Sequence, residues 1–222
     1  MKYMIHTCEA RLWYVEEYLI PSMLKQGIKE DDIYNYVDEK HEGNLVSFVV
    51  SCHKSYEMWG EQNVWHMQDD VLICSDFKER TEKLEEQDGI ICAFTCCYDD
   101  DNRLPGPSTP KNYMWWSFPC IRIPNKIAKE MAVWADIYVW RDNQYGFWIR
   151  QKKGDDVIFR VFVESYYPNE PVLNLAPNLV EHIDYLLGGS VVNTQRSQEN
   201  VRSKYFDEPE LANKLQEEIF KR

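Results

Sequence analysis

The chain has 222 residues, a length that suits one domain with at most a small addition. With 44% hydrophobic and 14% aromatic residues it can bury a large core, which excludes an intrinsically disordered chain. Its formal net charge of −12 argues against broad electrostatic attraction to nucleic acid or anionic lipid, although a local basic cleft stays compatible with it.

No apolar run approaches the ~20 residues needed to span a bilayer, and residues 1–6 lack the long apolar centre of a signal peptide. We therefore expect a cytoplasmic protein without membrane insertion. The seven cysteines are an odd number, lie mostly in apolar segments and form no paired Cys-x-x-Cys knuckles. They are expected to be reduced core thiols rather than ligands of a structural zinc ion.

Hydrophobic periodicity and turn residues indicate that strands and helices alternate through the first half of the chain. The predicted elements of this half are an extended segment at 4–7, a helix at 13–24 that Pro21 kinks or shortens and Gly27 ends, a strand at 32–38, a helix at 45–59, a strand at 64–67, a charged helix at 76–86 that Asp76 caps, and a strand at 89–95. This alternation predicts an α/β fold with a mostly parallel central sheet flanked by helices, and a ligand crevice at the carboxyl ends of the strands.

The second half is richer in aromatic and polar segments, and no internal repeat appears in the chain. Its predicted elements are a polar, proline-rich loop at 99–111, an aromatic, strand-rich segment at 113–123, a helix from Pro124 to about 136, a helix from Gly154 through Val163, a final strand and turn at 174–183, and a polar tail from Thr194 with a short helix at 208–221.

Two adjacent carboxylates, Asp69 and Asp70, stand between apolar runs at the end of the strand predicted at 64–67. Burying two ionised carboxylates side by side is costly, because like charges repel and each loses its hydration. One explanation is a divalent metal that carries a phosphorylated ligand, since Mg²⁺ and Mn²⁺ prefer carboxylate oxygen. The alternative is an Asp-Asp turn that caps the helix near Asp76.

Several of these features, in this order, resemble the nucleotide-sugar half of a GT-A glycosyltransferase. They are the N-terminal strand with Arg11 behind it, the strand that ends in Asp38, and the xDD triplet Gln68-Asp69-Asp70. Later in the chain, two segments resemble the acceptor helix and the late histidine of that fold, namely Gly154-Asp155-Asp156 and Pro177-Asn178-Leu179-Val180-Glu181-His182-Ile183.

The resemblance covers roughly residues 3–190 and implies a fold and a domain organisation. We expect one GT-A, or Rossmann-like, domain at 1–193, with a donor half at about 1–100 and an acceptor half at about 101–193. A polar C-terminal tail at 194–222 follows it.

The resemblance also implies a metal site that holds the nucleotide-sugar. In the family the last carboxylate of the triplet, here Asp70, ligates Mn²⁺ or Mg²⁺, and Asp69 contacts the ribose or a metal-bound water. Gln68 stands where the family most commonly has an acid, so the resemblance does not imply a carboxylate-to-ribose contact at this position. His182 either completes the metal sphere, for which a neutral imidazole suits Mn²⁺, or is a loop histidine bonded to the backbone.

Asp155 and Asp156 begin the helix predicted after Gly154, and two interpretations are open. Acidic residues favour helix N-termini through the helix dipole, by about 0.3–1 kcal/mol each. In the GT-A fold an acid at this place deprotonates the acceptor hydroxyl, which implies a catalytic base and an inverting reaction. Of the two, Asp156 is the preferred candidate on this interpretation.

Three further polar residues are candidates for binding the donor. Arg11, at the first strand–helix turn, either reaches the diphosphate or solvates the surface. Asp38 either accepts a hydrogen bond from the base or ribose, or caps a turn. Asn44 follows Gly43 and is predicted to be a helix N-cap rather than a donor contact.

The middle of the chain is aromatic, and both sugars and bases stack on aromatic faces. Most of these rings are expected in the core, but Trp115 and Trp116 are candidates for a wall that binds the acceptor. The run Asp99-Asp100-Asp101 contains a second Asp-x-Asp, but it lies in a polar loop where such runs are typically solvated. That loop is a candidate flap over the donor.

The sequence thus predicts a metal-dependent glycosyltransferase that moves a sugar from a nucleoside-diphosphate-sugar to a hydroxyl acceptor. The acceptor is a glycan or a modified DNA base, the latter as for glycosyltransferases encoded by bacteriophages, which would place the protein in the host cytoplasm. Two alternatives stay open. The first is a nucleotidyltransferase, which normally carries a glycine-rich loop after its first strand, whereas Thr7-Cys8-Glu9-Ala10-Arg11 has no glycine. The second is a non-catalytic interaction module built on a decayed transferase fold.

Overall fold

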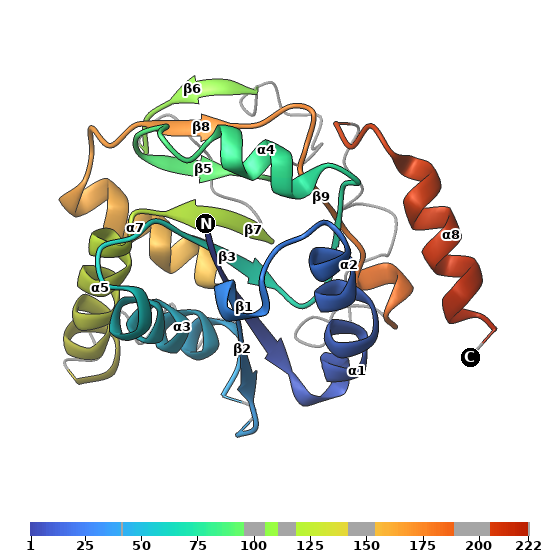
Figure 1. Cartoon of the computed structure of the whole chain (residues 1–222). Coiled ribbons are helices and arrows are strands. Elements are labelled where there is room, and N and C mark those ends of the chain that lie inside the picture. Colours follow the sequence, from blue (N-terminus) through green and yellow to red (C-terminus); the bar gives the residue numbers. More distant parts are fainter. Residues whose placement is uncertain (41, 96–104, 111–118, 142–153, 189–204, 222) are drawn as a thin grey trace.

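The structure is a computed structural model, and it describes residues 1–40, 42–95, 105–110, 119–141, 154–188 and 205–221 (Figure 1). Within these residues the central sheet consists of β1 (Lys2–Cys8), β2 (Ile33–Asp38), β3 (Val64–Gln68), β5 (Ile90–Cys92), β6 (Gly106–Ser108), β7 (Cys120–Ile123) and β8 (Val172–Asn174). A separate two-stranded sheet joins β4 (Val71–Ile73) to β9 (Val180–His182).

The strands of the central sheet follow the order β2-β1-β3-β7-β5-β8-β6. Strand β1 pairs in parallel with both β2 and β3, and β5 pairs in parallel with β8. Strand β7 runs antiparallel to both of its neighbours, and β6 runs antiparallel to β8. Five of the strands therefore point the same way, which confirms the predicted mostly parallel sheet.

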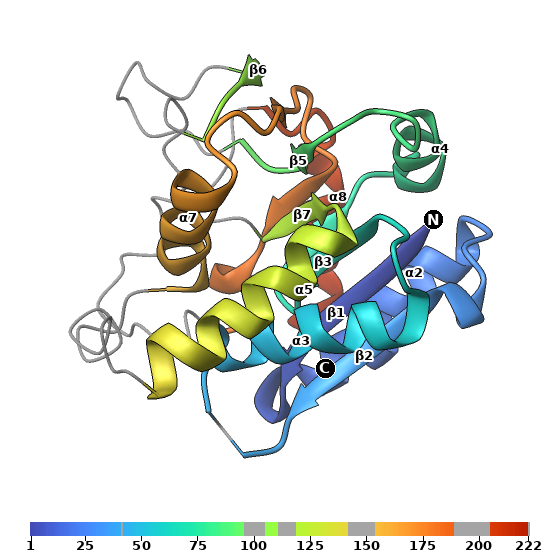
Figure 2. The same ribbon diagram turned by 90° about the vertical axis from the view of Figure 1, so that its left-hand side faces the viewer.

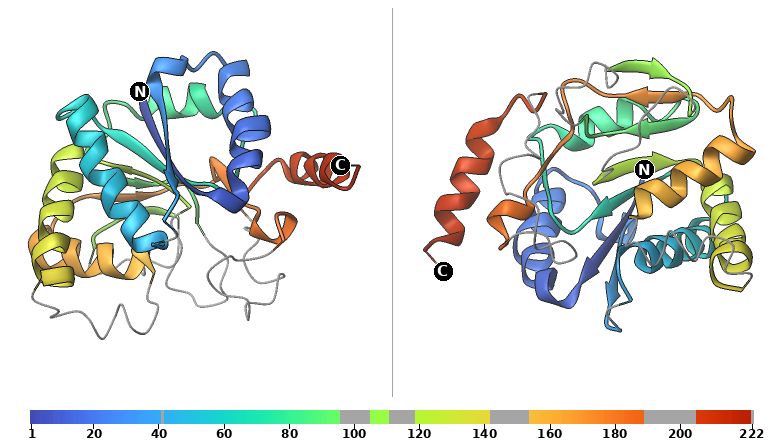
Figure 3. Two further views of the ribbon diagram at one scale, coloured as in Figure 1. Left: turned by 90° about the horizontal axis from the view of Figure 1, so that it is seen from below. Right: turned by 180° about the vertical axis from the view of Figure 1, so that it is seen from behind.

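Helices cover both faces of the sheet, as predicted for a Rossmann-like domain. One face carries α3 (Asn44–Trp59), α5 (Asn125–Trp134) and α7 (Asp155–Tyr166), which lie side by side in Figure 2. The other face carries α1 (Leu12–Tyr14), α2 (Ile20–Lys25), α4 (Phe77–Lys83) and the C-terminal α8 (Pro209–Ile219). Helix α8 stands at the side of the molecule away from α5 and α7 (Figure 3).

Alternate residues of each strand feed two separate hydrophobic cores, because successive side chains of a strand point to opposite faces. On β5, Ile90 and Cys92 pack with α3, α5 and α7, whereas Ile91 packs with the elements of the other face. Phe48 of α3 is fully buried in the first core, and its ring contacts the rings of His6, His66 and Phe159 at centroid distances of 6.1, 5.9 and 5.6 Å. The β1 and β3 side chains on this face therefore lie under α3.

Several element boundaries differ from the sequence predictions. The segment predicted as one final strand and turn, 174–183, contains the last residue of β8 and the whole of β9, which belong to different sheets and are separated by a cis Ala176–Pro177 peptide. The helix predicted at 13–24 runs through a π-helical segment, Val15–Leu19, and Pro21 lies in the first turn of α2, where it needs no hydrogen-bond partner. The loop predicted at 99–111 contains the edge strand β6.

Helix boundaries elsewhere follow the predictions closely. Gly27 has a φ of +82°, which ends the first helical segment. Gly43, with a φ of +94°, is the N-cap of α3, and Asn44 is its first helical residue rather than the cap. In the part of the chain that the structure describes, no helix is both long and apolar enough to cross a membrane.

Candidate functional site

The candidate site lies where β1 and β3 end. From β1 the chain passes to β2 on one side, and from β2 it returns through α3 to β3 on the other side of β1. Open α/β sheets bind their ligands outside the carboxyl ends of the strands at such a reversal of strand order. Here β1 ends at Cys8 and leads into the 3-10 turn Glu9–Arg11, and β3 ends at Gln68, directly before Asp69 and Asp70.

Asp69 is tied to the end of β1. One of its carboxylate oxygens accepts hydrogen bonds from the Thr7 hydroxyl at 2.9 Å and from the Cys8 backbone N–H at 2.8 Å. The other oxygen accepts a hydrogen bond from Nη1 of Arg11 at 3.0 Å. Both oxygens of this buried carboxylate therefore already have donors from the protein itself.

Asp70 is held by two basic side chains. Its Oδ2 contacts Nη1 of Arg11 and lies 3.3 Å from Nε2 of His182. Arg11 is only 5% exposed, so the same guanidinium nitrogen bridges both carboxylates in a site largely closed to water. The Nδ1 of His182 in turn lies 3.6 Å from Oδ1 of Asp184.

The small β4–β9 sheet brings His182 to Asp70. Val71, the first residue of β4, pairs with His182, and the backbone N–H of Ile183 donates to the Asp70 carbonyl at 2.8 Å. The buried Tyr14 hydroxyl donates to the Val71 carbonyl at 2.8 Å, which fixes β4 against the first helical segment. The predicted proximity of Asp70 and His182 is thus present in the structure.

Burial and these contacts change the pKa values of Asp69, Asp70 and His182. Burial alone would raise the pKa of Asp70, but the adjacent His182 and Arg11 lower it below its usual value. Burial opposes a charged His182, yet the Asp70 carboxylate raises the pKa of this imidazole above its usual value. Burial, and then the neighbouring Asp70, raise the pKa of Asp69. The site therefore favours an ionised Asp70 paired with cationic Arg11 and His182.

One atom of this cluster fits the requirements of a divalent ion. Oδ1 of Asp70 is buried and has no hydrogen-bond partner among the described residues, and a buried carboxylate oxygen normally has one. Nε2 of His182 instead faces Oδ2, the oxygen that Arg11 also contacts, so this imidazole could join an ion only in its neutral form. Asp69 does not fit as a direct ligand, because Thr7, Cys8 and Arg11 occupy its oxygens.

The second pair of acids, Asp155 and Asp156, lies at the start of α7, next to the end of β3. Asp155 is 4% exposed, and its Oδ2 accepts a hydrogen bond from Nε2 of Gln68 at 3.0 Å. Burial, and then the neighbouring Asp156, raise the pKa of Asp155 to about 7. Asp156 is half-buried, and its Oδ1 accepts from the backbone N–H of Val157 at 2.8 Å, as expected for an acid at a helix N-terminus.

Asp155 is therefore the better candidate base, although the sequence favoured Asp156. A base works best when its pKa lies near the working pH, and Asp155 meets that condition through burial. Asp156 instead folds over Gly154, where an added Cβ would lie 2.6 Å from its Oδ1.

The remaining predicted residues have varied placements. Arg11 is buried on the carboxylates, which excludes the alternative that it solvates the surface and leaves its contact with the diphosphate as a prediction. Asp38 accepts hydrogen bonds from the N–H groups of Glu42 and Gly43, at 3.1 and 2.9 Å, as expected for a turn cap. Trp115 and Trp116 lie outside the described residues, as does the Asp99-Asp100-Asp101 run.

Sequence reasoning did not assign roles to Thr7, to the Cys8 N–H or to Asp184, and it did not foresee the Gln68–Asp155 contact. No local sequence signal pointed to them, because they depend on the parallel register of β1 and β3, in which His6 pairs with Gln68. This register puts the residues that follow each strand side by side. Strand pairing is a tertiary contact, so local sequence patterns do not reveal it.

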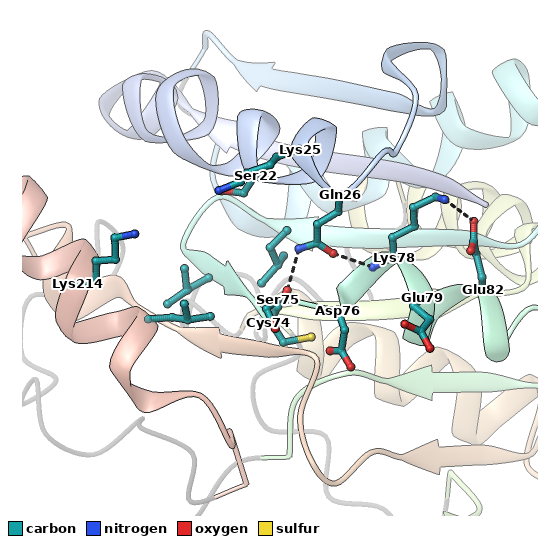
Figure 4. Close-up of a pocket in the computed structure, with 13 residues that line it drawn as sticks. Ser22, Lys25, Gln26, Cys74, Ser75, Asp76, Lys78, Glu79, Glu82 and Lys214 are labelled. Carbon is teal, nitrogen blue, oxygen red and sulfur yellow. Dashed lines mark hydrogen bonds and ion pairs between the residues drawn. The ribbon is translucent and has the colours of Figure 1, made fainter.

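A separate cavity of about 600 Å³ lies between α2, α8 and the segment that joins β4 to α4 (Figure 4). Gln26 crosses it, donating to the Cys74 carbonyl at 2.8 Å and accepting from the Lys78 N–H at 3.0 Å. Cys74, Asp76 and Glu208 each bring one possible ligand atom within 4.8 Å of the others. Ser75 already donates to the Glu208 carboxylate, so we do not place the functional site in this cavity.

No protein-family model matches the chain, and no curated protein matches it in sequence. Among solved structures, S. aureus TarS residues 1–349 match with a TM-score of 0.52 and 13% identity, over 85% of this chain and 62% of that one. A197 from STIV matches with a TM-score of 0.48 and 12% identity, over 82% of this chain and 86% of that one. The inositol-1-phosphate CTP transferase from T. maritima matches with a TM-score of 0.47 and 11% identity, over 98% and 97% of the chains. The similarity to TarS is one of fold, and it agrees with the single mixed α/β, Rossmann-like domain described above.

Proposed function

We propose that this protein is a glycosyltransferase that takes a sugar from a nucleoside-diphosphate-sugar and passes it to a hydroxyl acceptor. The observation that carries the proposal is the buried Asp69–Asp70 pair at the switch point of the sheet, with Arg11 and His182 on its carboxylates. A nucleoside diphosphate leaves with developing negative charge, and preorganised cationic groups stabilise such charge. The GT-A-like fold supports the same conclusion.

In this proposal Asp70 would hold Mn²⁺ or Mg²⁺ through Oδ1, which has no protein donor in the described part of the chain, and His182 in its neutral form would be the second ligand. A bound divalent ion supplies Lewis-acid stabilisation of the diphosphate oxygens. Arg11 fixes both carboxylates in place and adds positive charge beside the diphosphate. Asp69 holds the end of β3 against the end of β1 through Thr7 and Cys8.

Asp155 would act as the general base. It takes the proton of the acceptor hydroxyl while that oxygen attacks the anomeric carbon of the sugar and the bond to the diphosphate breaks. One displacement of this kind inverts the anomeric configuration. The pKa of about 7 that burial gives to Asp155 suits a base that must be deprotonated before it acts near neutral pH.

The test is thermal stabilisation of the protein by UDP, GDP and CMP, each with and without Mn²⁺. A manganese-dependent increase in melting temperature with a nucleoside diphosphate supports the proposal, because a ligand that binds only the folded state stabilises it. Asp70→Asn should remove that manganese-dependent increase. Asp76→Asn serves as the control, since Asp76 is an exposed acid at the start of α4 and belongs to the other group that could hold a metal ion, with Cys74 and Glu208.

The same panel separates the alternatives. Stabilisation by nucleoside triphosphates alone would favour a nucleotidyltransferase, and no stabilisation by any nucleotide would favour a non-catalytic interaction module. Either result would contradict glycosyl transfer. Once a donor has been found, glycans and hydroxymethylated DNA are the two acceptor classes to compare for sugar incorporation.

A further inference from the structure

Gln68 joins the two halves of the candidate site. Its side-chain amide crosses from the end of β3 to the start of α7 and donates from Nε2 to Oδ2 of Asp155 at 3.0 Å. The two residues are 87 positions apart in the sequence, so this contact belongs to the tertiary structure. Oδ1 of Asp155 accepts a second hydrogen bond from the backbone N–H of Asp156 at 3.1 Å.

The backbone of Gln68 is held firmly. Its N–H donates to the Pro119 carbonyl at 2.7 Å, and the residue pairs with His6 in the parallel β1–β3 register. Strand geometry directs the Gln68 side chain toward the face that carries α3 and α7, the same face on which His66 meets Phe48. The next residue, Asp69, bonds instead to Thr7 and Arg11. Gln68 thus contacts the second acidic pair, and the next residue, Asp69, belongs to the first.

The chemistry of an amide suits this position. Asp155 is 4% exposed, and its carboxylate accepts hydrogen bonds from two neutral donors, the Gln68 amide and the Asp156 backbone N–H. A primary amide can donate to a carboxylate whether that carboxylate is ionised or not. A glutamate of the same length would place a second carboxylate at hydrogen-bond distance from Asp155, and the two groups would then share a proton.

We propose that Gln68 is a positioning residue that holds the base Asp155 beside the donor site, and that an amide is required here for Asp155 to work as a base. This inference rests on the function proposed above. In the reaction, the acceptor O–H proton passes to a carboxylate oxygen of Asp155, and the acceptor oxygen forms a bond to the anomeric carbon. The bond between that carbon and the diphosphate oxygen breaks, and the nucleoside diphosphate leaves with the electron pair.

The first test concerns the contact itself and needs no substrate. Melting temperatures are measured for the wild type, Gln68→Met, Asp155→Ala and the double variant of these two. If the bridge exists, the effect of the double variant differs from the sum of the two single effects, because each single change already removes the contact. Additive shifts would overturn the proposal.

A reversed pair separates positioning from a merely structural role. The double variant Gln68→Glu with Asp155→Asn restores an amide–carboxylate hydrogen bond with the two partners exchanged. We expect its melting temperature to return toward that of the wild type, while transfer stays lost because the carboxylate now lies on β3. Recovery of both stability and activity would overturn the assignment of Asp155 as the base that Gln68 positions.

The second test is kinetic, with release of UDP or GDP from UDP-glucose, UDP-N-acetylglucosamine and GDP-mannose as the measurement and water as the acceptor. For Gln68→Met and Gln68→Glu we expect kcat to fall by about tenfold or more, with the donor KM within about twofold of the wild type. Gln62→Glu is the matched control, because it makes the same change at an exposed position shortly before β3. Wild-type kcat in Gln68→Glu would overturn the proposal.

The two tests also distinguish this inference from the proposed function. A wild-type protein that binds and consumes none of the donors contradicts glycosyl transfer, and the catalytic role of Gln68 falls with it. Non-additive melting temperatures in that case would leave Gln68–Asp155 as a structural tie. Donor consumption with unchanged kcat in both Gln68 variants would contradict only the role of Gln68.

Discussion

Two pairs of adjacent aspartates flank the end of β3, and their carboxylates have partners of different charge. Asp69 and Asp70 receive the guanidinium of Arg11, and Asp70 also faces His182. Asp155 is equally buried but accepts hydrogen bonds from an amide and a backbone N–H, and no cationic group is in contact with it in the described part of the chain. The pKa of Asp70 is lowered and that of Asp155 is raised to about 7.

An Asp-Asp motif therefore has no fixed chemistry of its own. The partners that the fold supplies decide whether a buried carboxylate stays ionised or holds its proton near neutral pH. An ionised Asp70 suits the binding of cationic groups at the leaving group, and the carboxylate of a weaker acid, Asp155, suits the acceptance of a proton from the acceptor. Two identical dipeptides can therefore serve the two ends of one reaction, which is how catalytic carboxylates commonly divide their roles.

The largest expected effect comes from removing the cation of the first pair. Arg11→Met should lower the free energy of unfolding by about 3–5 kcal/mol, because it leaves two buried carboxylates with only His182 to compensate them. Urea denaturation measures the change. Arg160→Met, which breaks the half-exposed Arg160–Glu164 pair, is the control and should change stability by less than about 1 kcal/mol. Equal losses in the two variants would contradict the role assigned to Arg11.

The next effect concerns the second pair. Asp155→Asn should lower the kcat of donor consumption by about a hundredfold or more and leave donor binding intact, because a general base typically contributes a factor of this size. Single-turnover kinetics and calorimetric donor titration together measure both quantities. A variant that keeps wild-type kcat would remove Asp155 from the reaction.

A smaller effect should appear in the pH dependence of stability. Burial raises the pKa of Asp155 from 3.8 to about 7, so between these values the folded protein binds more protons at this site than the unfolded chain. The wild type should therefore lose stability relative to Asp155→Asn as the pH rises through that window. Denaturation midpoints of both proteins from pH 4 to pH 8 measure the difference, and parallel curves would contradict the prediction.

The smallest effect is expected at Asp156. Asp156→Asn should change the free energy of unfolding by at most about 1 kcal/mol, the usual size of an acid's interaction with a helix N-terminus. Donor consumption should stay close to that of the wild type, because the Asp156 carboxylate bonds to the backbone N–H of Val157. Strong loss of kcat here, with wild-type stability, would reverse the assignment of base between Asp155 and Asp156.

Much of the fold could be predicted from local pattern. Alternation of strands and helices indicated the α/β class, and Gly27, Gly43 and Pro124 marked helix ends close to where the structure has them. The final segment could not be divided correctly, because β8 and β9 are three residues each and join different sheets. Such short strands carry too few residues for a periodic signal.

The candidate site could also be predicted only in part. The carboxylates of Asp69 and Asp70 were visible because two adjacent acids between apolar runs are unusual, and a resemblance to a known fold drew attention to His182 and to the acids after Gly154. The buried position of Arg11 and the Gln68–Asp155 contact were not visible. Each depends on strand register and on helix placement, which bring together residues 58 and 87 positions apart.

Local patterns predicted most of the strands and helices and the position of two carboxylates after a buried strand, because periodicity and burial cost act over a few neighbouring residues. The groups that face those carboxylates depend on the tertiary structure. The β1–β3 register supplies Thr7 and Cys8, the β4–β9 pairing supplies His182, and the packing of α7 supplies Asp155. Electrostatic interactions depend on distance in space, so the chemistry of each acid is fixed only when the chain has folded.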